Sequence, residues 1–165
     1  MLIAGIDPGA NGAIAVLDSE NPDSVALLDL KKNSTYCIYL WLLSQLSKNC
    51  SEKPYIPESQ IWVEDIHSMY GMSAKSNFTF GKNLGTVLTI SAILKRDTPK
   101  MITPKVWQKY IGVTAKGKAI KQDVAKIAQG LYPSAELHGK KGGLLDGRSD
   151  ALMIAHYGLH NKEKG

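Results

Sequence analysis

The strongest constraint on the fold lies at the start of the chain, where a short apolar run ends in an acidic residue and a tight turn. Residues 2–7 read Leu-Ile-Ala-Gly-Ile-Asp and are followed by Pro8 and Gly9. An apolar run of this length, stopped by turn residues, predicts a buried strand. Further strands are predicted at 13–18 and 24–30, so the chain is expected to begin with an antiparallel meander.

After this start, the predicted helices and short strands alternate. The predicted helices cover residues 36–47, 77–94, 103–110, 118–129 and 146–160. The predicted strands between them cover residues 60–64 and 101–102. Strands that alternate with helices after an antiparallel start predict an α/β domain. We therefore expect a mixed central sheet of about five strands, flanked by helices.

Length and charge narrow the class of protein. The 165 residues suit a single domain that spans 1–165, and a net charge of +5 suits a polyanionic partner. The lysines concentrate between Lys95 and Lys141. Neither a signal peptide nor an apolar run of about 18 residues is found, so we expect a cytoplasmic protein that is neither secreted nor membrane-bound. Cys37 and Cys50 lack the spacing of a zinc site.

Four carboxylates stand at the ends of predicted elements. Asp7 ends the first strand, Glu64 ends the strand 60–64, and Asp146 and Asp150 open the last helix. A separation of four residues places the last two on one helical face. If the two strands are neighbours in the sheet, all four side chains can converge at one edge.

Clustered carboxylates repel one another unless cations neutralise them, and Mg²⁺ prefers oxygen ligands. Two such ions can activate a water and stabilise the leaving oxygen of a phosphodiester. The pattern therefore indicates a metal-dependent nuclease. Simpler roles stay open for single residues: Asp7 as a turn residue, Glu64 as an exposed strand end, and Asp146 or Asp150 as a helix cap or first-turn acid.

At these residues the chain resembles the RuvC family of Holliday junction resolvases. Three segments carry the resemblance, namely Gly5-Ile6-Asp7-Pro8-Gly9, Val63-Glu64 with Gly81-Lys82-Asn83-Leu84-Gly85, and Asp150-Ala151-Leu152-Met153-Ile154-Ala155-His156. It extends over nearly the whole chain. The sequence Asp-Gly-Arg-Ser-Asp at residues 146–150 is similar to that of phage-encoded members of the family.

The resemblance implies a ribonuclease H-like fold and a homodimer that makes paired nicks across four-way DNA junctions, with two Mg²⁺ or Mn²⁺ ions per active site. It makes Asp7, Glu64 and Asp150 metal ligands, with Asp146 as the fourth carboxylate. Bacterial members carry that acid three residues before the last Asp, whereas here it stands four before. By its spacing, Lys121 matches a family lysine near the scissile phosphate.

The family also places an aromatic side chain, which enters the junction centre, in the loop after the second motif. His67 stands at the matching position, and Met69 and Tyr70 are bulkier neighbours; we favour Tyr70 because stacking on a base is worth about 1–3 kcal/mol.

Lysine and arginine side chains contact phosphates without reading sequence. The predicted contacts are Lys75, Lys82, Lys105, Lys109, Lys116, Lys118, Lys140, Lys141 and Arg148.

Three other functions stay open. An RNA-processing nuclease of the YqgF type would share the fold, and a junction-binding protein without activity would share the basic surface. ATPases of the actin and sugar-kinase class share the Gly-Ile-Asp-x-Gly turn, but they need two such domains. A branch-migration helicase is a possible partner that the sequence does not identify. The sequence also does not show whether the protein acts in a bacterial cell or in a phage-infected host.

Overall fold

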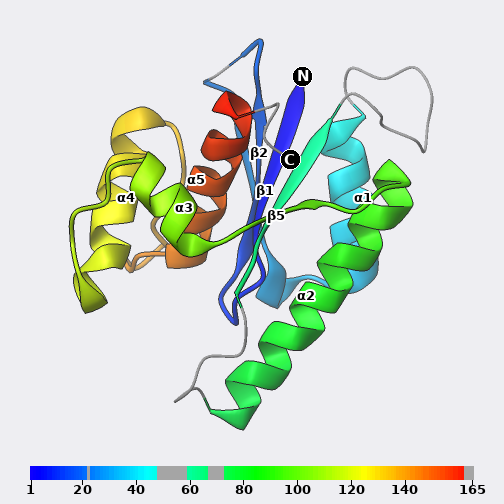
Figure 1. Cartoon of the computed structure of the whole chain (residues 1–165), viewed down its shortest axis with the longest axis horizontal. Helices are drawn as coiled ribbons and strands as arrows, with labels where there is room; N and C mark the ends of the chain where they lie inside the picture. The colour runs from blue at the N-terminus through cyan, green and yellow to red at the C-terminus, as the bar shows by residue number, and fades with distance from the viewer. Residues whose placement is uncertain (22, 48–58, 67–72, 162–165) are drawn as a thin grey trace.

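The computed structural model describes residues 1–21, 23–47, 59–66 and 73–161, with a five-stranded sheet at the centre (Figure 1). The strands are β1 (Leu2–Asp7), β2 (Ala13–Asp18), β3 (Val25–Asp29), β4 (Gln60–Glu64) and β5 (Lys100–Ile102). Their order is β3-β2-β1-β4-β5. The sheet is mixed, because β1 pairs antiparallel with β2 and parallel with β4.

Helices cover both faces of this sheet. They are α1 (Thr35–Leu46), α2 (Ala74–Lys95), α3 (Pro104–Tyr110), α4 (Ile120–Leu131) and α5 (Asp146–His160), with short 3-10 turns η1 (Leu30–Lys32) and η2 (Gly117–Ala119). Figure 1 shows α1 and α2 on one side of the sheet and α3, α4 and α5 on the other. The predicted α/β architecture is confirmed. None of the helices in the described ranges has the length and apolar character needed to cross a bilayer.

Strand β1 sends alternate side chains into two separate cores. Leu2, Ala4 and Ile6 pack with residues of α1 and α2, while Ile3 packs with residues of α3, α4 and α5. A strand covered on both faces has no polar side, since successive side chains point to opposite faces. This explains why the strand reads as a continuous apolar run.

Helix α5 approaches β1 closely because glycine stands at the contact. A Cβ atom on Gly5 would overlap the backbone of Ala151 and Ala155, and one on Gly147 would overlap the carbonyl of Asn11. The second contact holds the first turn of α5 against the turn between β1 and β2. The start of α5 is thereby placed next to the carboxyl end of β1.

Candidate active site

Asp7 and Glu64 emerge side by side at one edge of the sheet. β1 and β4 are parallel, and Ile6 lies opposite Val63, so the next residue of each strand is an acid at the same edge. Both acids are buried, with 8% of Asp7 and 4% of Glu64 exposed. Buried carboxylates normally have a cationic partner, but no described lysine or arginine forms an ion pair with either.

The turn after β1 holds the Asp7 side chain in place. The Gly9 N–H donates to Asp7 Oδ1 at 2.8 Å, and the Gly12 N–H donates to the Gly9 carbonyl at 2.9 Å. Asn83 on α2 donates its side-chain N–H to the same carbonyl at 3.0 Å. Asn83 therefore connects α2 to the turn that positions Asp7, a role that no sequence pattern had indicated.

Trp107 on α3 positions Glu64. Its ring is fully buried, and its Nε1–H donates to Glu64 Oε1 at 2.9 Å. Trp107 belongs to the apolar core on the α5 side of the sheet. Its hydrogen bond to Glu64 joins positions 43 residues apart and could not be read from spacing.

Helix α5 supplies the other two carboxylates. Asp146 is the first residue of α5, and Leu145 occupies the N-cap position. The alternative that Asp146 is the helix cap is therefore wrong, and no side chain makes a capping bond there. Asp146 instead pairs with Lys121 of α4. Asp150, one turn further along, is partly buried, and no hydrogen bond from a described residue reaches its carboxylate.

Electrostatic coupling joins the four acids into one site. Burial raises the pKa of Asp7 to about 6, and the nearby charge of Asp146 adds to the rise. Burial, with the charge of Asp7, raises the pKa of Glu64 to about 8. The pKa of Asp150 lies well above its ordinary value because of burial and the charges of the other three acids. The acids thus oppose one another's ionisation, and among the described residues only Asp146 has a cationic partner.

The donor set suits hard divalent cations. Buried carboxylate oxygens that repel one another are ligands that Mg²⁺ or Mn²⁺ would stabilise. Among the described residues, no group of three acidic, imidazole or thiol side chains lies close enough to enclose an ion. The chemistry of the residues fits, and the side chains must draw together when an ion binds.

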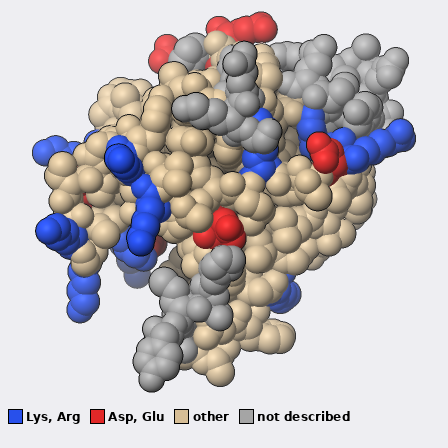
Figure 2. Space-filling view, viewed as in Figure 1, with Lys and Arg blue, Asp and Glu red and all other residues tan. Residues whose placement is uncertain are grey.

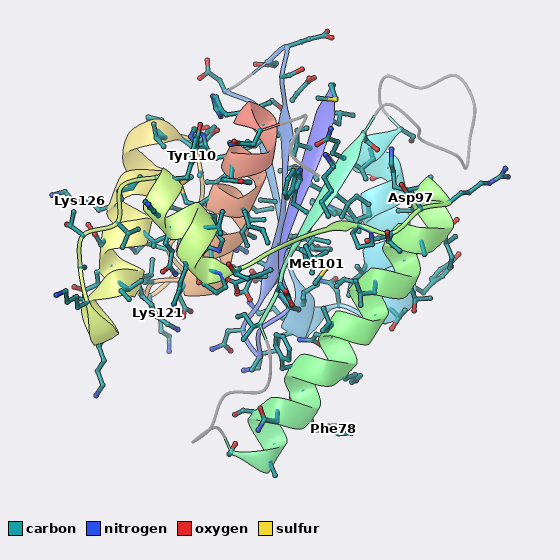
Figure 3. All side chains as sticks on the ribbon, viewed as in Figure 1. Phe78, Asp97, Met101, Tyr110, Lys121 and Lys126 are labelled. Carbon is teal, nitrogen blue, oxygen red and sulfur yellow. The ribbon has the colours of Figure 1, made fainter. Side chains whose placement is uncertain are left out.

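Lys121 supplies the positive charge nearest to this cluster. Its hydrogen bond to Asp146 raises the pKa of the ammonium, and the charges of Asp150 and Asp7 raise it further. Figure 3 labels Lys121 on α4, the helix packed beside α5. The family resemblance predicts that Lys121 lies near the scissile phosphate, and the structure places it beside Asp146, where the charges of Asp7 and Asp150 also act on it.

Arg148, one of the predicted phosphate contacts, is held by hydrogen bonds within the protein. Its Nε and Nη2 donate to the two carboxylate oxygens of Asp29 at 2.7 and 3.1 Å, and its Nη1 donates to the Glu136 carbonyl at 2.8 Å. The bonds from Arg148 to the Asp29 carboxylate lower the pKa of Asp29. With 17% of the Arg148 side chain exposed, its contact with phosphate stays a prediction. The hydrogen bonds tie the first turn of α5 to the end of β3.

The remaining predicted basic residues are exposed. They are Lys75 and Lys82 on α2, Lys105 and Lys109 on α3, Lys116 and Lys118 near η2, and Lys140 and Lys141 before α5. Figure 2 shows lysine and arginine side chains gathered over the side of the molecule formed by α3 and α4. The predicted junction residues His67, Met69 and Tyr70 lie outside the described residues.

The raised pKa values predict how the metal-free protein responds to pH. Asp7 and Glu64 keep their protons in the folded chain at pH values where the unfolded chain has lost them. The folded state then binds more protons, so the free energy of unfolding falls as pH rises from about 4 to 8. A tenfold change in proton affinity is worth about 1.4 kcal/mol, so we expect a loss of a few kcal/mol.

Urea unfolding in EDTA between pH 5 and 8 measures this slope. Asp7→Asn and Glu64→Gln should each flatten it, and millimolar Mg²⁺ should raise the stability at pH 8. A stability that rises with pH over this range would contradict the buried, unneutralised carboxylates.

Comparison with known proteins identifies the class of fold. No protein-family model matches the chain, and no curated protein is significantly similar to it. Solved structures do match over nearly its whole length, and they show that the chain has the ribonuclease H-like fold, as predicted.

Two of the matching solved structures are of RuvC from Thermus thermophilus. One is described as RuvC in complex with Holliday junction substrate; its TM-score is 0.61 at 16% identity, and the match covers 99% of this chain and 96% of that one. A second RuvC structure gives a TM-score of 0.56 at 20% identity and covers 98% and 96%. At these identities the likeness shows the fold alone. It gives no support to the predicted closeness to phage-encoded members.

Proposed function

We propose that the chain is a structure-selective endonuclease, a single nuclease domain over residues 1–165 that cuts branched DNA. The observation that carries this proposal is the cluster of Asp7, Glu64, Asp146 and Asp150 at one sheet edge, where burial raises the pKa of Asp7, Glu64 and Asp150, and where Lys121 pairs with Asp146 alone. The four acids are proposed to hold two Mg²⁺ or Mn²⁺ ions. The resolved complex of a similarly folded RuvC with a Holliday junction supports a four-way junction as the substrate.

Each protein group has a defined part in this reaction. Divalent cations, when bound, activate water and stabilise the leaving oxygen of a phosphodiester. The Gly9 N–H fixes one oxygen of Asp7, and the Trp107 N–H fixes one oxygen of Glu64, so each acid keeps another oxygen for an ion. The Lys121 ammonium lies beside Asp146, where it can offset charge that develops on the phosphate.

The proposed enzyme is a homodimer, because paired nicks in a two-fold junction suit two symmetric active sites. Helix α2 offers a surface for this contact. Phe78 is 76% exposed and Ile93 is 56% exposed, and no other described segment lies within 4 Å of the position that a Cβ on Gly81 or Gly85 of the same helix would take. Figure 3 shows Phe78 projecting away from the rest of the molecule. Two small residues one turn apart allow a second backbone to approach closely.

The proposed junction contacts include the loop and the exposed lysines. Tyr70, with His67 and Met69 beside it, is proposed to enter the junction centre. The lysines of α2, α3 and η2 are proposed to contact phosphates. Action in the cytoplasm remains a prediction of the sequence, which identifies no helicase partner.

Cleavage of an end-labelled four-way junction tests the proposal. We expect paired nicks with Mg²⁺ or Mn²⁺, no cutting in EDTA, and little cutting of a linear duplex of the same sequence. An RNA hairpin serves as the second substrate. Cutting of RNA in place of the junction would transfer the assignment to an RNA-processing nuclease, and tight junction binding without cutting would leave a binding protein.

Replacing Trp107 by Phe tests how Glu64 is positioned. The ring volume is largely kept, but Glu64 loses a buried hydrogen bond worth about 1–3 kcal/mol. Since that bond lowers the pKa of Glu64, its loss raises the pKa further. We expect about tenfold slower cleavage at pH 7, an activity profile displaced to higher pH, and a higher Mg²⁺ requirement. An unchanged pH profile would show that Trp107 serves only the core.

A further inference from the structure

Two adjoining hollows form one groove that begins at the candidate active site. The first, of about 270 Å³, is lined by residues that include Asn11, Lys31, Lys32 and Asp146. The second, of about 570 Å³, is lined by residues that include Lys32, Lys140 and Lys141. Lys32 and the neighbouring pair Leu144 and Leu145 line both. The groove therefore runs from one of the four carboxylates to the lysines of the loop before α5.

Lys31 and Lys32 are held beside the turn that carries Asp7. Both are exposed residues of η1, which begins at the buried Leu30. The Leu30 N–H donates to the Gly12 carbonyl at 2.9 Å, so η1 is hydrogen-bonded to the turn between β1 and β2. Lys31 Nζ also reaches Asn11 Oδ1 at 3.4 Å. Sequence reasoning had not selected either lysine, because they lie far from the basic stretch in the chain.

Lys140 and Lys141 occupy the tip of an ordered turn at the far end of the groove. The Gly142 N–H donates to the Gly139 carbonyl at 2.8 Å, and the Gly139 N–H donates to the Gly143 carbonyl at 2.8 Å. Gly142 has a φ of 78°, a conformation that glycine adopts without strain. The two lysines thus project from a backbone that is fixed before any ligand binds.

The charge of the groove favours an extended polyanion. Its carboxylates are largely matched within the protein: Asp29 accepts two bonds from Arg148, and Asp146 pairs with Lys121. Glu136 is 89% exposed at the rim. The four lysines then exceed the negative charge that remains. A series of cations along a groove matches the repeating phosphates of a nucleic-acid strand.

We propose that this groove holds the phosphodiester backbone of the DNA strand that continues from the phosphate being cut. The proposal rests on the proposed nuclease function and adds to it the path of one strand. Lys31 and Lys32 contact the phosphates nearest to the active site, and Lys140 and Lys141 contact those further along. Such contacts position the strand without reading its sequence.

Binding of a labelled four-way junction in EDTA, measured by fluorescence anisotropy over a range of KCl concentrations, tests the path. The variants are the doubles Lys31→Gln with Lys32→Gln and Lys140→Gln with Lys141→Gln. The control is Lys126→Gln, an exposed lysine that points outward from α4 (Figure 3) and lines neither hollow. Thermal unfolding checks that each variant is folded.

We expect each double variant to raise Kd about tenfold at moderate salt and to reduce the slope of log Kd against log [KCl] by about one to two. The control should match the wild-type protein. If the wild-type protein binds and cuts junctions while both double variants bind like the control, the groove proposal alone is wrong. If the wild-type protein neither binds nor cuts, the proposed function is wrong, and the groove proposal fails with it.

Discussion

Replacing Asp7 by Asn is expected to reduce Mg²⁺-dependent junction cleavage by a factor of about 10³ or more while leaving junction binding in EDTA intact. The variant loses one of two buried strand-end carboxylates and therefore a ligand charge for the ions that drive the reaction. Asparagine has nearly the same shape, and its side-chain oxygen can still accept the Gly9 N–H. The fold should persist, and the metal-free protein should be more stable at pH 8, because a buried charge has been removed.

Asp18→Asn is the matched control. Asp18 also ends a strand, but it pairs with Leu2 at the opposite end of β1 and lies near the N-terminal amine. Its replacement should leave cleavage within about twofold of the wild-type rate, as is usual for surface changes away from a site. Full activity of Asp7→Asn would show that the carboxylate cluster is not the catalytic centre.

Replacing Gly5 by Ala is expected to destabilise the protein by about 3 kcal/mol or more, or to prevent soluble expression. The new methyl group would overlap the backbone of Ala151 and Ala155 on α5. Backbone atoms cannot rotate away as a side chain can, so β1 and α5 would have to separate. That movement also displaces Asp150 from the strand end, so any folded fraction should cut DNA poorly. Urea unfolding gives the change in free energy.

Gly130→Ala provides the contrasting substitution. Gly130 lies in α4, and among the described residues no neighbouring segment lies within 4 Å of the position of a new Cβ. Alanine is the better helix former, so stability should stay constant or rise by up to about 1 kcal/mol. If Gly5→Ala is tolerated as well as Gly130→Ala, then α5 does not pack on β1 as closely as described.

Much of the fold could be predicted because its elements have strong local patterns. The strands Leu2–Asp7 and Gln60–Glu64 and the helix Asp146–His160 were predicted with the bounds that the structure has. Each combines an apolar core face with an abrupt polar or turn boundary. The start of α2 was less predictable: it begins at Ala74, not at residue 77, because its first turn is polar and Ser73 caps it by accepting from the Ser76 N–H.

In the candidate site, too, some residues could be predicted from local sequence and others could not. The four acids were found from the sequence because each stands at an element end, and the parallel pairing of β1 with β4 brings Asp7 and Glu64 to one edge. Their role as metal ligands remains a proposal. Spacing could not reveal the groups that hold the acids, since such contacts join residues far apart in the chain.

The sequence by itself determined which segments form the sheet, which residues at their ends are acidic, and that the surface is basic. These properties follow from local periodicity and composition, which the chain carries residue by residue. Only the tertiary structure decided that Trp107 serves Glu64, that Asn83 supports the Asp7 turn, and that Arg148 pairs with Asp29. It also brought Lys32 beside the site. The reason is physical: such contacts depend on how the sheet, helices and turns pack in space, and that packing has no local signature.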